Sequence, residues 1–190
     1  MRKLFDKFSV FDYVIMALMA AVGVAVKPIV TAVAHIITGS LFIPAGTVAG
    51  GIYMLFLVLG AAIVGKRGAS TMIAVVQALI MVVSGIFGTH GIISLLTYSA
   101  PGLAIDLIWL LMRHRGCCAL CCFFAGMVAN MTGSFGSNVI FFRLPWLPLL
   151  IMLAASALSG GLGGLIAWNI NKVLIKYKLT GRGSLQDKGF

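Results

Sequence analysis

The stretch PAGTVAGGIYMLFLVLGAAIVGKRGASTMIAVVQALIMVVSGIF, residues 44–87, contains two apolar runs joined by the basic turn Gly65-Lys66-Arg67-Gly68. Each run, 44–64 and 69–87, has close to the roughly 20 apolar residues that cross a bilayer as a helix. Short loops rich in Lys and Arg stay on the cytoplasmic side of a membrane. The stretch therefore predicts a helical hairpin that spans the membrane twice and turns in the cytoplasm.

The same pattern extends in both directions along the 190 residues. The chain is 61% hydrophobic and 9% charged, and its acidic residues are all Asp, which is typical of a membrane protein and not of a soluble core. We expect one transmembrane domain over residues 1–177 and a polar cytoplasmic tail over 178–190. Six helices are predicted, over residues 11–37, 44–64, 69–87, 92–112, 117–139 and 147–175. Lys27-Pro28 is expected to kink or break the first of them.

The positive charges fall on alternate ends of these runs. Twelve of the 14 Lys and Arg lie at the ends that share a side with the basic turn, and only Lys27 and Arg143 lie elsewhere. This asymmetry predicts that both termini are cytoplasmic. It also accounts for the net charge of +10 without nucleic acid as a partner, because the charges flank apolar spans.

Two runs carry small residues at four-residue spacing. Ala17, Ala21 and Ala25 share one face of the first helix, and Ser156, Gly160 and Gly164 share one face of the last. Small residues let helix backbones approach closely in lipid, either inside one bundle or against a partner protein. We expect one of these faces to serve the bundle and the other a partner.

Polar side chains gather in the outer halves of several runs, where they are costly unless they face a cavity or one another. Interhelical hydrogen bonding explains any one of them, but the set together indicates a pocket open to the outside. Amides, Tyr and His suit a flat heterocyclic ligand better than an ion. The predicted binding residues are Lys27, His35, Gln77, His90, Tyr98, Asn130 and Asn138.

Other reactive groups have simpler explanations. Asp106 is expected to be a buried acceptor that ties helices together, through backbone freed by Pro101. Cys117, Cys118, Cys121 and Cys122 lie at a cytoplasmic helix start, so we expect reduced thiols that pack as small apolar groups, with no metal site. The sequence holds no motif of catalysis and no P-loop, which predicts a protein that is not an enzyme, has no cofactor and cannot hydrolyse ATP.

Over residues 11–177 the chain resembles the S component, the substrate-binding membrane subunit, of energy-coupling factor (ECF) vitamin transporters. The resemblance lies in the alanine series from Ala17 to Ala25, in IPAGTVAGGIYMLFLVLGAAIVGKRGAS and in GTHGIISLLTYSAPGLAID. It implies a six-helix bundle in a bacterial or archaeal cell membrane. It also implies capture of a vitamin or vitamin precursor from outside, and docking of Ala17, Ala21 and Ala25 on a transmembrane coupling protein that two ATPase subunits drive.

The resemblance does not identify the vitamin. Two other functions are compatible with the residues. An autonomous homo-oligomeric channel or transporter would need a polar path to the cytoplasm, toward which only Asp106 points. A membrane enzyme or assembly factor would need the four cysteines.

Overall fold

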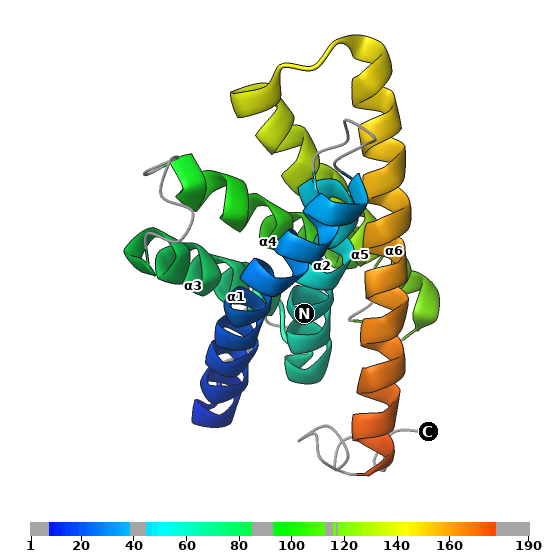
Figure 1. Cartoon of the computed structure of the whole chain (residues 1–190). Coiled ribbons are helices and arrows are strands. Elements are labelled where there is room, and N and C mark those ends of the chain that lie inside the picture. The colour runs from blue at the N-terminus through cyan, green and yellow to red at the C-terminus, as the bar shows by residue number, and fades with distance from the viewer. Residues whose placement is uncertain (1–7, 39–44, 85–92, 113–115, 117, 178–190) are drawn as a thin grey trace.

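The computed structural model describes residues 8–38, 45–84, 93–112, 116 and 118–177, and all the regular elements in these ranges are helical. Figure 1 shows them as one bundle, in which the long last helix runs beside the second and fifth. The elements are α1 (Val10–Thr38), α2 (Ala45–Val64), α3 (Ala69–Ser84), α4 (Ile93–Leu111), α5 (Ala119–Ser137), the π-helix η1 (Asn138–Phe142) and α6 (Trp146–Lys176).

The six predicted helices are confirmed, with starts close to those expected. Four of them, α1, α2, α5 with η1, and α6, are long and apolar enough to cross a membrane. The described parts of α3 and α4 are shorter apolar helices. The predicted end of the third span at 87 and start of the fourth at 92 lie outside the described residues, as does the predicted tail 178–190.

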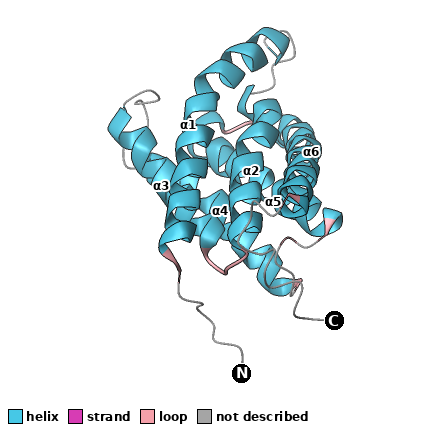
Figure 2. Ribbon diagram, turned by 90° about the horizontal axis from the view of Figure 1, so that it is seen from below, coloured by secondary structure: helices cyan, strands magenta, loops and turns pink. Residues whose placement is uncertain are grey.

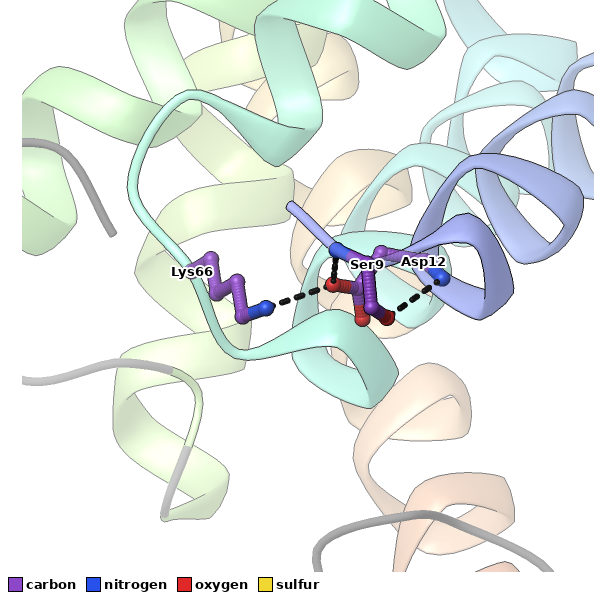
Figure 3. Close-up of polar contacts among 3 residues, drawn as sticks. All are labelled: Ser9, Asp12 and Lys66. Atoms are coloured by element: carbon purple, nitrogen blue, oxygen red, sulfur yellow. Dashed lines mark hydrogen bonds and ion pairs between the residues drawn. The ribbon is translucent and has the colours of Figure 1, made fainter. Parts of the chain in front are cut away.

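The first helix runs on through Pro28, so of the two alternatives expected there the break is wrong and the kink stays a prediction. The start of this helix is fixed by two reciprocal hydrogen bonds. The Ser9 N–H donates to the Asp12 carboxylate (2.7 Å), and the Asp12 N–H donates to the Ser9 hydroxyl (3.3 Å). The same carboxylate pairs with the Lys66 ammonium at 2.6 Å, as Figure 3 shows. This capping box joins the start of α1 to the basic turn between α2 and α3.

Helices α2, α5 and α6 pack at backbone distance. A Cβ added to Gly163 would lie 2.0 Å from the carbonyl oxygen of Gly51, and one added to Gly160 would lie 2.3 Å from that of Gly126. A Cβ on Gly164 would lie 2.0 Å from the carbonyl oxygen of Cys122. The small-residue face of α6 therefore serves the bundle itself, as expected for one of the two faces. Figure 2 shows the three helices as neighbours from a second direction.

The core lies between α2 and the helices around it. Its fully buried members are mostly small, such as Ala61, Ala62, Ala74 and Ala125, with Ile73 and Ile105 as the larger fillers. Large apolar side chains lie instead on the outside, Leu18, Leu107 and Leu158 among them. This inverted arrangement is the one that a hydrocarbon solvent favours.

Asp106 caps a helix of the bundle. Its carboxylate accepts hydrogen bonds from the backbone N–H (2.8 Å) and the hydroxyl (2.5 Å) of Thr71, in the first turn of α3. The expectation that Asp106 is an acceptor tying two helices together is confirmed, but the residue is half-buried, and its partner is the start of α3 and not backbone freed by Pro101. A carboxylate at a helix N-terminus satisfies free N–H groups and meets the positive end of the helix dipole.

The cysteine cluster differs from the expectation of free thiols. Cys118 and Cys121 are paired as a disulfide across the first turn of α5, with Cα atoms 5.3 Å apart. Cys118 is the N-cap in extended conformation, and its sulfur accepts the Cys121 N–H (3.4 Å), which brings the two side chains together. Cys122 lies outside this disulfide as a buried thiol, as expected for a small packing group, and its sulfur donates to the Gly116 carbonyl oxygen (3.8 Å).

Replacing Gly164 by Ala tests the close packing. The added methyl has to displace the Cys122 backbone, and overpacking of this kind costs about 1–3 kcal/mol. Thermal unfolding in detergent should show a lower midpoint for Gly164→Ala.

Gly136→Ala is the matched control, since a Cβ there meets no atom within 4 Å. It should be neutral or stabilising by up to about 1 kcal/mol through helix propensity. Equal midpoints for the two variants would contradict backbone contact between α5 and α6.

Candidate ligand-binding site

Lys27 lies at the centre of a cluster of side chains from three helices. It points inward from α1 and is only 4% exposed. Its ammonium lies 4.2 Å from the centre of the Tyr98 ring on α4 and 5.7 Å from that of Tyr53 on α2. Both contacts fall within the range at which a ring face attracts a cation. The sequence analysis predicted that Lys27 and Tyr98 belong to one site, and the structure brings these two residues into contact.

Tyr53 is held in place by α1. Its hydroxyl is 2.6 Å from the Thr31 hydroxyl, and it also donates to the Lys27 carbonyl oxygen at 3.4 Å. Thr31 lies one helical turn after Lys27, so both residues share a face of α1. The sequence analysis missed Tyr53, whose signal was a phenol inside an apolar run that needs a polar partner at membrane depth.

The charge of Lys27 is incompletely compensated. Among the described residues no carboxylate lies within ion-pair distance of its ammonium. Removing an ion from water costs several kcal/mol in proteins, whereas a desolvated cation–π contact returns about 2 kcal/mol. The nearer ring, that of Tyr98, therefore offsets only part of this cost, and the more distant Tyr53 ring adds less.

Gln77 of α3 packs against α1 at Gly23, which is one helical turn before Lys27. A Cβ added to Gly23 would lie 2.2 Å from the Gln77 amide nitrogen, so the Gln77 side chain fills that space. Gln77 is 4% exposed, and its amide nitrogen has no hydrogen-bond partner among the described residues. The hydroxyl of Ser99, next to Tyr98, is likewise unpartnered there. Gln77, beside the turn of α1 that precedes Lys27, thus carries a buried donor without a partner in the described part of the chain.

Asn130 is committed to bonds between helices. Its amide nitrogen donates to the carbonyl oxygens of Thr47 on α2 (3.1 Å) and Ser156 on α6 (2.9 Å). Its oxygen fills the space beside Gly50, 1.8 Å from the position of an added Cβ. One turn on, the Ser134 hydroxyl accepts a hydrogen bond from that of Ser156 (2.7 Å). These contacts hold α5 to α2 and α6, and a role of Asn130 toward ligand stays a prediction.

Asn138 closes the end of α5. Its side-chain oxygen accepts the Leu144 N–H (3.0 Å), and its carbonyl accepts the Arg143 N–H (2.7 Å) across the π-helix. Arg143 adopts a left-handed backbone conformation with φ 46°. Of the remaining predicted residues, His35 is exposed near the end of α1, and His90 lies outside the described residues. The roles of these three in ligand binding also stay predictions.

The alanine stripe of α1 faces away from the bundle. Ala17, Ala21 and Ala25 are all exposed, whereas Ala20 and Val24 on the adjacent face are buried. In the described part of the chain this stripe is therefore not used for packing. One helix presents Lys27 inward and small residues outward.

The geometry describes a multi-pass membrane protein with a buried polar site on its first helix, and the comparison with family models places it among transport proteins. The sequence model of the family "ABC-type cobalt transport system, permease component" matches residues 11–132, and the chain belongs to this family. The comparison with curated proteins finds no match.

A solved structure described as "Crystal structure of an S-component of ECF transporter" has the same fold. It superposes with a TM-score of 0.79 at 22% sequence identity, over 96% of this chain and 94% of that chain. The S-component resemblance seen in the sequence is thus confirmed for the fold.

Asn130→Ala should destabilise the protein whether or not ligand is present. The variant loses two hydrogen bonds between helices and leaves a small cavity, and we expect a loss of about 1–3 kcal/mol. Thermal unfolding of the detergent-solubilised protein measures it.

Asn169→Ala is the control, since Asn169 is an exposed residue of the same type on α6. It should change stability by less than about 0.5 kcal/mol. Normal stability of Asn130→Ala with lost ligand binding would instead make Asn130 a direct ligand contact.

Proposed function

We propose that this protein is the S component of an ECF-type ABC importer in a bacterial or archaeal plasma membrane. It captures a vitamin or vitamin precursor from outside and delivers it inward with a transmembrane coupling protein and two ATPase subunits. The observation that carries the proposal is the division of α1 between two faces. Lys27 faces a buried site, while Ala17, Ala21 and Ala25 form an exposed face without large side chains.

The position of Lys27 supports access from outside. The described residues beside the basic clusters meet at one end of the bundle: Asp12 pairs with Lys66, and a Cβ added to Gly116 would lie 3.1 Å from that of Ala62. In Figure 1 the start of α1 and the end of α6 share that lower end. The positive-inside rule assigns this end to the cytoplasm. Lys27 follows Asp12 by 15 residues, or about 22 Å of helix, which puts it in the outer part of a bilayer about 30 Å thick.

The alanine stripe supports a partner protein in the membrane. Apolar side chains gain nothing by leaving lipid for another apolar surface, so helix association there depends on close backbone approach. A stripe of exposed Ala on a helix otherwise covered by Leu, Ile and Val offers that approach at one place. The coupling protein of an ECF module is the partner that fits this face.

The alternatives are less well supported by the geometry. The carboxylate of Asp106, the residue that favoured a polar path through the membrane, is used to cap α3. Cys118 and Cys121 are joined to each other, and Cys122 is buried. Neither feature provides the path of a channel or the open reactive group of an enzyme.

Ala21→Trp separates docking from binding. The ligand is first identified by mass spectrometry as the compound that co-purifies with the solubilised protein, and its labelled form is then followed. Trp at position 21 should prevent close approach of the coupling protein, so uptake into cells should fall to background while ligand binding to the purified subunit stays within about twofold.

Leu158→Trp is the control, since Leu158 is 66% exposed on α6. It places the same bulk in the membrane away from α1, and uptake should continue. Undiminished uptake by Ala21→Trp would refute the docking face, and a protein that binds no vitamin-like molecule would refute the whole proposal.

A further inference from the structure

The groups around Lys27 are unbalanced in hydrogen-bonding character. The Lys27 ammonium and the Gln77 amide nitrogen can only donate. Among the described residues Lys27 has no carboxylate partner, and the Gln77 nitrogen has no hydrogen-bond partner. The hydroxyl of Tyr53, whose ring lies beside Lys27, is already bonded to Thr31 and to the Lys27 carbonyl. A molecule that binds here has to bring acceptor atoms with it.

A metal cation has the opposite requirement. Divalent metal ions such as Co²⁺ bind carboxylate, imidazole and thiolate groups, and among the described residues no three His, Cys, Asp or Glu side chains gather as a site. The buried ammonium of Lys27 would also repel a dication. The metal in the name of the matching family is therefore poorly matched to this cluster.

We infer that the cargo held at Lys27 is an organic molecule that presents hydrogen-bond acceptors, such as a carboxylate or the nitrogen and oxygen edge of a heterocycle, to Lys27 and Gln77. The inference rests on the proposed function, since it names the chemistry of the substrate at that site. The ammonium lies over the ring face of Tyr98, 4.2 Å from its centre. When the Lys27 ammonium moves from the ring to an acceptor of the ligand, this face of Tyr98 becomes accessible, and a flat ligand can then stack on it.

A retention experiment on the purified full-length protein tests this. The protein is mixed with biotin, pantothenate and nicotinate as carboxylates, riboflavin as a neutral ring, thiamine as a cation with an acceptor ring, and CoCl₂. After size-exclusion chromatography, retained compounds are measured by mass spectrometry and cobalt by elemental analysis. Wild-type protein should retain one of the organic compounds, and Lys27→Met should retain at least about tenfold less of it.

Lys172→Met is the matched control. Lys172 also lies over an aromatic ring, 5.2 Å from the centre of Trp168, but it is exposed on α6. This variant removes the same charge and the same kind of contact, and retention should be unchanged. Gln77→Leu provides a second test of the donor pair if Lys27→Met does not fold, and it should also weaken retention.

Each outcome decides between the claims. A compound retained equally by wild type, Lys27→Met and Gln77→Leu would overturn the inference and leave the proposed function standing. Retention of cobalt alone, or of nothing, would overturn both. If retention depends on Lys27, the retained compound itself identifies the acceptor as a carboxylate or as the edge of a ring.

Discussion

The close contact of α6 with α2 and α5 is the constraint on which the other features depend. Gly160, Gly163 and Gly164 bring backbone against backbone, and a single methyl group at any of them would meet a carbonyl oxygen. In lipid such packing replaces the hydrophobic effect as the source of helix association. Because α6 already covers α2 and α5 on one side, α1 packs on the other side of the bundle, against α2 and α3, and keeps one face exposed.

That arrangement explains why two similar small-residue patterns have different uses. The face of α6 is covered by its neighbours, whereas Ala17, Ala21 and Ala25 are exposed. Spacing alone could not separate the two, because both repeat every four residues. Glycine permits contact between backbones of one chain at the shortest distance, and alanine leaves a shallow surface that a second protein can approach.

The described helix bounds lie close to the predicted ones because long apolar runs separated by basic or polar turns report directly on helix length. Lys27 and Tyr98 could also be named, since both are polar groups in the outer halves of apolar runs, but the contact between them was not predicted. The partners of Asn130 and Asp106 could not be named, because all of them except the Thr71 hydroxyl are backbone groups of other helices, and no side-chain pattern reports where those will lie. Tyr53 was missed for a related reason: α2 is apolar on all sides, so its sequence does not indicate which side faces Lys27. The Cys118–Cys121 pair depends on the N-cap geometry of one residue, which the sequence does not specify.

Helix α1 carries both Lys27, at the centre of the candidate site, and the exposed alanine stripe. Ala21 and Lys27 are six residues apart on α1, about 9 Å along its axis, and point to different sides of it. The ion pair between Asp12 and Lys66 holds the start of α1 to the turn between α2 and α3. A partner that pushed on the alanine face would tilt α1 about this ion pair, and the Lys27 ammonium would then move relative to Tyr98 on α4. No chain of intermediate residues would be needed to transmit the movement. The mechanical connection between a membrane partner and the bound molecule would then be a single helix.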